Sequence, residues 1–215
     1  MTNFKLTLFS DQLGPGQVLA LHDGPTVGFV SRGSIEIRGS NSVVTRYDSP
    51  TAFVSWSPCD VSCGDGGATV DRWMVLRDGE VPMGDPLLAE SIEVTGDQPF
   101  LLRCDEVHFP PHGVAYLHTH AGPGIRRLTM GGLQVDTDGR SNTYAVGDPW
   151  FESGPIAVYA RASSDGAAFV RVMVLPAEYQ GRSSIRYVLE EDRDRPKPQR
   201  YIVHVDEVGN YDSFN

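Results

Sequence analysis

The sequence has few cysteines, no excess of positive charge and no long apolar run, and each of these absences excludes a class of protein. Its 215 residues contain 28 acidic and 18 basic side chains, which give a formal net charge of −10. Nucleic-acid-binding domains usually carry a basic stripe, so we expect no nucleic-acid partner. No window approaches the ~20 apolar residues of a membrane span, and residues 1–16 lack the apolar core of a signal peptide. We therefore expect a cytoplasmic protein with no membrane partner.

The only cysteines are Cys59, Cys63 and Cys104. A small, odd number of cysteines is typical of a reducing compartment. Cys59 and Cys63 could form half of a zinc site, but no second pair of Cys or His follows at the spacing of a zinc ribbon. We expect free thiols in or near the core.

Glycine and proline are abundant, with 23 and 15 residues, and they separate short segments with the pattern of β-strands. Examples are "SIEIRG", "LQVDTDG", "AVYARAS" and "FVRVMVL", which alternate in polarity or are rich in β-branched residues. "DTDGRS" between two such segments predicts a hairpin, and only "GDPLLAES" could form a short helix. Many short strands between frequent turns predict an all-β sandwich or barrel.

The chain repeats itself at an offset of 98 residues, the distance from His22 to His120. The same offset places Gly24 on Gly122, Pro25 on Pro123 and Gly33 on Gly131. With one residue of slippage, "GATVDRWMVL" lies on "GAAFVRVMVL", with six of ten positions identical. At the offset of 98, Phe53 also falls on Phe151 and Ser55 on Ser153. Three blocks in the same order predict a duplicated domain. We expect an N-terminal domain over residues 1–90, a C-terminal domain over 91–180 and an extension over 181–215.

One long segment, "HFPPHGVAYLHTHAGPGIRRLTMGGLQVDTDGRSNTYAVGDPWFESGP", resembles the cupin superfamily. It contains a Pro-Pro-x-Gly turn, a His-x-His pair on the next strand, a glycine at the following hairpin, and a Gly-Asp before an aromatic-rich stretch. The resemblance covers roughly 65 residues of the C-terminal half well and, through the repeat, most of the chain more weakly. It implies an all-β protein of two tandem double-stranded β-helix (jelly-roll) barrels.

The His-x-His pair is His118 and His120, and residues two apart on a strand point to the same face. Two imidazoles that enter a barrel together are half of a site for Fe, Mn, Ni, Cu or Zn. The resemblance implies that a metal cupin would add a Glu four residues after the second His and a third His on a later strand. Here the first of these positions is Gly124, and the second is Ala157 or Val158.

Glu152 is the one nearby carboxylate, and the repeat aligns it with Val54, so the shared scaffold does not require it. If it turns inward, His118, His120 and Glu152 form a two-histidine, one-carboxylate metal site. If it caps a turn on the surface, this site is incomplete. A site without metal therefore stays equally open.

Arg126 has the same strand parity as the two histidines, so we place it among the candidate site residues. A buried guanidinium needs a carboxylate or phosphate partner. It either clamps a substrate carboxylate or pairs with Glu152, and pairing would occupy the carboxylate that a metal needs. Tyr116 is a further candidate, as third ligand or as base.

The N-terminal half keeps His22 in the place of His120, but Ala20 aligns with His118 and Cys59 with Ala157. We interpret this half as a degenerate structural domain.

Three functions fit these residues. The first is a metal-dependent dioxygenase, isomerase or lyase with its site in the C-terminal barrel. The second is a metal-free, epimerase-like or isomerase-like enzyme that uses His118 or His120 as general base. The third is a non-catalytic protein that binds or senses a small anionic ligand, such as a carboxylate. We favour an enzyme, and we expect a homodimer in which residues 201–205 add an edge strand or cross to the partner.

Overall fold

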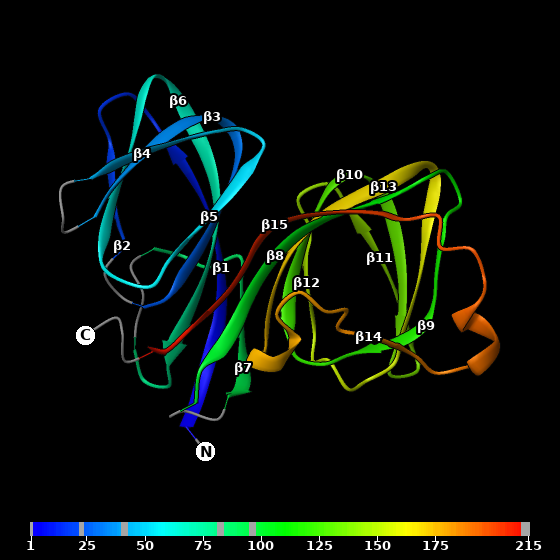
Figure 1. Cartoon of the computed structure of the whole chain (residues 1–215). Coiled ribbons are helices and arrows are strands. Elements are labelled where there is room, and N and C mark those ends of the chain that lie inside the picture. The colour runs from blue at the N-terminus through cyan, green and yellow to red at the C-terminus, as the bar shows by residue number, and fades with distance from the viewer. Residues whose placement is uncertain (1, 22–23, 40–42, 81–83, 95–97, 212–215) are drawn as a thin grey trace. The chain divides into compact units, whose positions relative to one another are not determined.

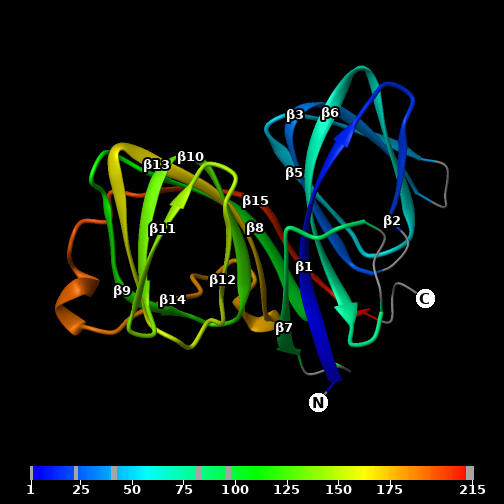
Figure 2. The same ribbon diagram turned by 180° about the vertical axis from the view of Figure 1, so that it is seen from behind.

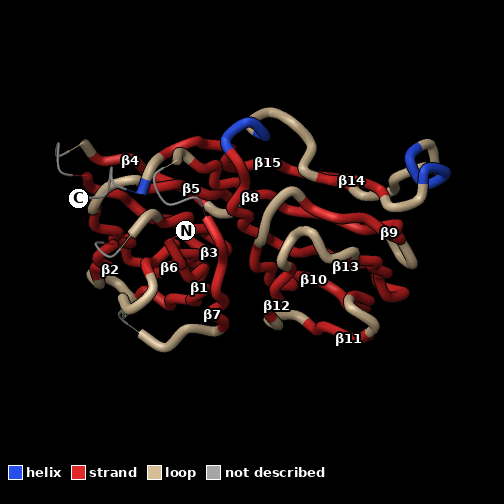
Figure 3. Tube along the Cα trace, turned by 90° about the horizontal axis from the view of Figure 1, so that it is seen from below, coloured by secondary structure: helices blue, strands red, loops and turns tan. Residues whose placement is uncertain are grey.

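The structure, a computed structural model, describes residues 2–21, 24–39, 43–80, 84–94 and 98–211. Strands dominate it (Figure 3), which confirms the all-β prediction. The strands are β1 (Thr2–Leu13), β2 (Val18–Leu21), β3 (Thr26–Gly39), β4 (Val44–Asp48), β5 (Thr51–Ser55), β6 (Cys59–Arg77), β7 (Leu88–Val94), β8 (Phe100–Phe109), β9 (Val114–His120), β10 (Gly124–Thr137), β11 (Arg140–Ala145), β12 (Pro149–Glu152), β13 (Val158–Pro176), β14 (Ile185–Tyr187) and β15 (Arg200–Gly209). Two 3-10 helices, Ala177–Tyr179 and Glu190–Arg193, follow β13. Residues 84–91 do not form the short helix considered above, because β7 begins at Leu88. No helix within the described ranges is long and apolar enough to cross a membrane.

The chain divides into two compact units. The N-terminal unit contains residues 1–102 and 207–215, and the C-terminal unit contains residues 103–206. The chain passes from one unit to the other within β8 and again within β15. Most of the expected extension, residues 181–215, is therefore part of the C-terminal unit.

The two units share one strand order. The N-terminal sheet runs β4-β3-β6-β1-β7, with β2 paired to β6 and β5 to β3. The C-terminal sheet runs β11-β10-β13-β8-β15, with β9 paired to β13, β12 to β10 and β14 to β9. Figures 1 and 2 show the strands of each unit curving around their own interior. This topology confirms the predicted double-stranded β-helix, and β15 lies as an edge strand beside β8 of the same chain.

The corners of both barrels explain the glycines of the repeat. Gly33 and Gly131 have φ angles of +79° and +69° at β-bulges in β3 and β10. A Cβ atom on Gly131 would lie 2.1 Å from the carbonyl oxygen of Gly166, and one on Gly33 would lie 2.2 Å from that of Gly67. Only glycine fits this left-handed, close-packed corner.

Each barrel has its own hydrophobic core and its own Arg–Asp pair. The N-terminal core consists of Leu13, Leu21, Val30, Ile35, Phe53, Cys59, Val61, Cys63, Ala68 and Val70. The C-terminal core consists of Val107, Phe109, Leu128, Leu133, Val135, Trp150, Val158, Ala160, Ala162, Ala167 and Phe169. Arg72 Nε donates to Asp11 Oδ2 at 2.8 Å in the first, and Arg171 Nε donates to Asp105 Oδ1 at 2.6 Å in the second. All three cysteines are buried free thiols.

Candidate functional site

A β-bulge in β9 decides which side chains enter the C-terminal barrel. On β13 the pairing advances two residues, from Ala160 to Val158, while on β9 it advances three, from Ala115 to His118. The extra residue breaks the strand's alternation, so Ala115 and His118 both line the interior. Tyr116 is not part of that lining, and its ring lies 5.2 Å from the guanidinium of Arg195. Tyr116, the candidate third ligand or base, therefore lies outside the lining of this cavity.

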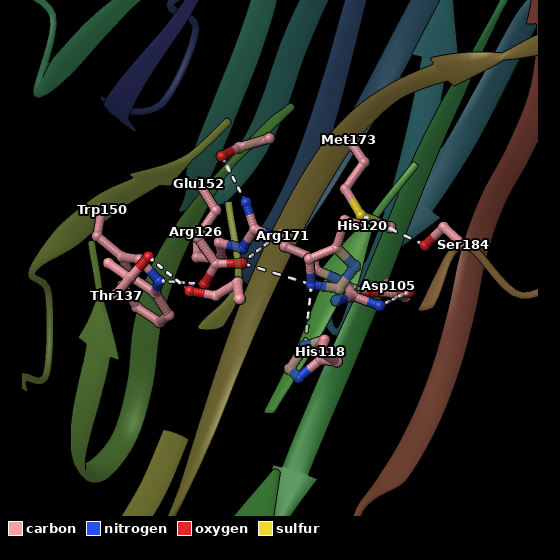
Figure 4. A network of polar contacts seen from close by, with 12 residues as sticks. Asp105, His118, His120, Arg126, Thr137, Trp150, Glu152, Arg171, Met173 and Ser184 are labelled. Carbon is pink, nitrogen blue, oxygen red and sulfur yellow. Dashed lines mark hydrogen bonds and ion pairs between the residues drawn. The ribbon is translucent and has the colours of Figure 1, made fainter. Parts of the chain in front are cut away.

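The two histidines are buried and linked to each other (Figure 4). His118 Nδ1 lies 2.6 Å from the carbonyl oxygen of Tyr116, so it carries the hydrogen and Nε2 carries a lone pair. His120 Nε2 lies 3.2 Å from that nitrogen and 3.4 Å from Glu152 Oε2, so its hydrogen has two acceptors within reach. His120 Nδ1 is buried without a hydrogen-bond partner.

Glu152 turns inward and pairs with Arg126. It ends β12, directly across from Gly124 at the start of β10. Arg126 Nη2 lies 2.6 Å from Glu152 Oε2, and Trp150 Nε1 donates to Oε1 at 2.9 Å. Arg126 Nη1 donates to the carbonyl oxygen of Gly124 at 2.5 Å, whereas the Nη2 hydrogens are not directed at any acceptor. The contact through Nη2 is thus a close ion pair, and of the two roles considered for Arg126 the structure shows the one with Glu152 as partner.

Burial sets the charge state of these groups. It lowers the pKa of His118, and it lowers the pKa of His120 to about 3, so both imidazoles are neutral near pH 7. Burial also lowers the pKa of Arg126, to about 10, which leaves it a cation. For Glu152, burial acts to raise the pKa, but the charge of Arg126 and the hydrogen bonds from His120 and Trp150 outweigh it and hold the pKa well below its usual range. The site is therefore a neutral imidazole pair beside a charged pair of zero net charge.

The interior of the barrel is small and lies next to a larger hollow. The inner cavity has a volume of about 20 Å³, room for about one water molecule. The hollow, which we call the mouth, has a volume of about 480 Å³ and is lined by β8, β13, β15 and residues 181–185. Arg171, Ile185 and Tyr201 line both spaces and so form the boundary between them.

Two arginines of the mouth, Arg103 and Arg171, are paired with aspartates. Arg171 makes a bidentate pair with Asp105, at 2.6 and 3.0 Å, and Arg103 Nε donates to Asp206 Oδ1 at 2.7 Å. These charge-assisted contacts, with two further hydrogen bonds from Arg103 to the carbonyl oxygens of Tyr179 and Arg182, hold the guanidinium planes in fixed orientations. The sequence reasoning missed Arg171, although it stands in an apolar run and matches Arg72 in the repeat.

The residues fit two metal ligands but not a third. Two nitrogens 3.2 Å apart can bind one ion at the usual 2.0–2.1 Å, and a carbonyl on Nδ1 is the common outer partner of a ligating histidine. The carboxylate of Glu152, however, is held by Arg126 and Trp150. Val158 faces the cavity opposite His118, where a third histidine would stand. Across the described part of the chain, no three His, Cys, Asp or Glu side chains are grouped to hold a metal ion.

The strand register corrects the alignment of Glu152 within the repeat. Gly124 and Thr26 are equivalent because they pair with Met173 and Met74 of the matching strands β13 and β6. Glu152 lies across from Gly124, and Ser55 lies across from Thr26. The counterpart of Glu152 is therefore Ser55 and not Val54.

The strand register also corrects the alignment of His118 within the repeat. His118 pairs with Val158, and Leu21 pairs with Cys59. The counterpart of His118 is thus Leu21 rather than Ala20, and that of Cys59 is Val158 rather than Ala157. His22, aligned with His120, lies outside the described residues.

The strand order and the inward His-x-His strand define an all-β protein with the cupin fold, and solved structures agree. No protein-family model and no curated protein matches the sequence. Oxalate decarboxylase from Bacillus subtilis is similar at 11% identity and a TM-score of 0.65, over 91% of this chain and 80% of that one. Lactobacillus farciminis oxalate decarboxylase, as a formate complex, has 11% identity and a TM-score of 0.65, over 89% and 82%. Salicylate 1,2-dioxygenase from Pseudaminobacter salicylatoxidans has 10% identity and a TM-score of 0.54, over 92% and 75%. At these identities the likeness is one of fold.

Proposed function

We propose that the protein is a metal-independent enzyme that catalyses proton transfer on a small molecule, as an isomerase or lyase does, in its C-terminal barrel. The observation that carries the proposal is the lone pair on Nε2 of His118. The Tyr116 carbonyl fixes this nitrogen as an acceptor, and it faces a site that also holds the cation of Arg126. A base and a cation in one buried site are what proton abstraction next to a carbonyl requires.

The mouth is the proposed binding place. Its volume of about 480 Å³ is in the range of small-molecule sites. The reacting end of a ligand reaches the histidines only if Ile185 and Tyr201, at the boundary, move aside. Such closing side chains also exclude water once the ligand is bound.

His118 is the better base of the two histidines. His120, with a pKa of about 3, binds a proton weakly, and its Nε2 hydrogen serves as a donor. In the proposed step, His118 Nε2 takes a proton from a carbon next to a carbonyl, and the electron pair of the broken C–H bond moves to the carbonyl oxygen. Arg126 stabilises the oxyanion, and the Tyr116 carbonyl and Glu152 stabilise the imidazolium. Return of the proton to the other face or to a neighbouring carbon completes an isomerisation.

Two alternatives have their own support. Fold neighbours include a structure whose subject is the Mn(II) centers of Bacillus subtilis oxalate decarboxylase, and the spacing of the histidines suits a metal. For a metal-dependent reaction here, the Glu152 carboxylate would have to release Arg126 and bind the metal ion instead. A non-catalytic protein that binds a small anion needs only the mouth, where Arg182 adds a third arginine to the lining.

Deuterium exchange tests the proposal. A thermal-shift screen of small carbonyl and carboxylate compounds finds ligands, and proton NMR in D2O then follows loss of their C–H signals. We expect exchange with metal-stripped wild-type protein, slowed by at least about 100-fold in His118→Asn and unchanged in Tyr116→Phe. Binding without exchange would favour the binding protein, and exchange that metal-stripping abolishes would favour the metal enzyme.

We also propose a homodimer, which light scattering tests. A monomer at all concentrations would rule it out.

A further inference from the structure

Three donor atoms in the C-terminal barrel follow one another at short separations, although with Arg126 in place the described side chains form no group that could hold a metal ion. They are His118 Nε2, His120 Nε2 and Glu152 Oε2, with separations of 3.2 Å between the nitrogens and 3.4 Å from His120 to the carboxylate. Ligands at the usual 2.0–2.2 Å from one ion have neighbouring separations of about 3 Å. All three side chains are buried.

The guanidinium of Arg126, a cation, already lies beside these three donor atoms. Arg126 Nη2 lies 2.6 Å from Glu152 Oε2, and the guanidinium is fully buried. A divalent ion on the same oxygen would sit close to the guanidinium in a medium where water does not screen like charges. The positive charge of Arg126 and that of a metal ion therefore compete for Glu152.

Gly124 is shaped to admit this guanidinium. A Cβ atom there would lie 2.6 Å from the carbonyl oxygen of Val172 and 3.1 Å from Arg126 Nη1. The carbonyl oxygen of Gly124 accepts a hydrogen bond from the same Nη1. The position four residues after His120 thus has no room for a carboxylate side chain and instead helps to fix the arginine.

We infer that the guanidinium of Arg126 takes the place of a metal ion in this barrel and keeps His118, His120 and Glu152 from binding a divalent transition cation. The barrel thus contains a latent metal site, and the side chain of Arg126 prevents a metal ion from binding there. This inference rests on the contacts of Arg126 and not on the proposed proton transfer.

The experiment is a cobalt titration of Arg126→Met, which removes the charge and keeps a long apolar stem. Proteins are purified without chelator or nickel resin, stripped by dialysis and titrated with Co2+, with visible absorption and metal content as readouts. We expect one Co2+ per chain in Arg126→Met, bound at least about 100-fold more tightly than in wild type. Co2+ should also raise the melting temperature of this variant, because the ion gives Glu152 a cation again.

Matched variants locate the ion. Arg127→Met, at the neighbouring position, should bind no more Co2+ than wild type. Arg126→Met combined with His120→Asn or with Glu152→Gln should lose the tight site and its absorption bands. If Arg126→Met does not fold, Arg126→Gln, which keeps a donor for the Gly124 carbonyl, takes its place.

Stoichiometric Co2+ in the wild-type barrel, as tight as in the variant, overturns the inference. So does a folded Arg126→Met or Arg126→Gln protein that binds none. The proposed function fails separately, when metal-stripped wild type exchanges no ligand C–H. A latent metal site can therefore stand without the proton transfer, and the proton transfer without the site.

Discussion

The two barrels share a strand order, a glycine at a β-bulge and an Arg–Asp pair, but among the described residues the C-terminal barrel alone has a histidine pair beside a buried Arg–Glu pair. Where the C-terminal barrel has His118, the register places Leu21, which is fully buried in the N-terminal core. Where it has Arg126, the N-terminal barrel has Gly28, and the ring of Phe53 lies so close that a Cβ atom there would be 2.3 Å from it. Residues that both barrels share build the fold, whereas His118 and Arg126 occur in the C-terminal barrel alone at these positions. At both positions the N-terminal barrel has an apolar or small residue, so the fold itself does not require a histidine or an arginine there.

The largest effect should come from breaking the Arg126–Glu152 pair. Glu152→Leu leaves a buried guanidinium without its counter-ion, and we expect a loss of about 3–5 kcal/mol in the free energy of unfolding. The double variant Arg126→Met/Glu152→Leu, which removes both charges of the pair, should recover most of the loss. Urea denaturation of the three proteins measures this. A double variant as unstable as the single one would show that the pair is needed for folding.

The Arg–Asp pairs should differ in strength. Asp105 has a side-chain exposure of 4%, whereas Asp11 has 21%. Asp105→Asn should therefore cost about 3 kcal/mol of stability, and Asp11→Asn about 1 kcal/mol, because water reaches Asp11 and weakens its ion pair with Arg72, whereas Asp105 is shielded. Equal losses in denaturant melts would contradict the role of burial.

The histidines should make stability depend on pH. The pKa of His120 in the folded chain, about 3, is below the ~6.5 of an unfolded histidine, so the unfolded state binds more protons between these values. Stability should fall as the pH drops from 6.5, by about 2 kcal/mol at pH 5. His118, whose pKa burial also lowers, acts in the same direction. Melting curves of wild type and His120→Asn at several pH values measure the effect, and an unchanged slope in the variant would exclude His120 as its source.

The smallest effect should come from Tyr116→Phe. The ring keeps its place beside Arg195, and the contact to His118 uses the backbone carbonyl. We expect a change of less than about 0.5 kcal/mol in stability. A larger loss in a denaturant melt would show that the hydroxyl takes part in the site.

The fold could be predicted from the sequence because the repeat and the strand pattern depend on short-range features, such as Gly33 and Gly131 at the β-bulges. It also identified Glu152 and Arg126 as the residues that distinguish the C-terminal half. It could not choose between their roles, since their contact depends on the register of β10 against β12. The sequence could not show that Tyr116 lies outside the cavity lining, because a β-bulge adds one residue without a recognisable pattern and reverses the alternation after it. The same kind of slip aligned Ala20 and Val54 with the wrong partners.

The hydrogen bond from Trp150 to Glu152 gives the C-terminal barrel an optical reporter. The indole N–H donates to one carboxylate oxygen while Arg126 holds the other. The emission of this indole therefore depends on the charge and partners of Glu152. Trp56 and Trp73, the other two tryptophans, belong to the N-terminal unit. With these two replaced by phenylalanine, the fluorescence of a single residue would follow events at the site in real time, before any ligand is known.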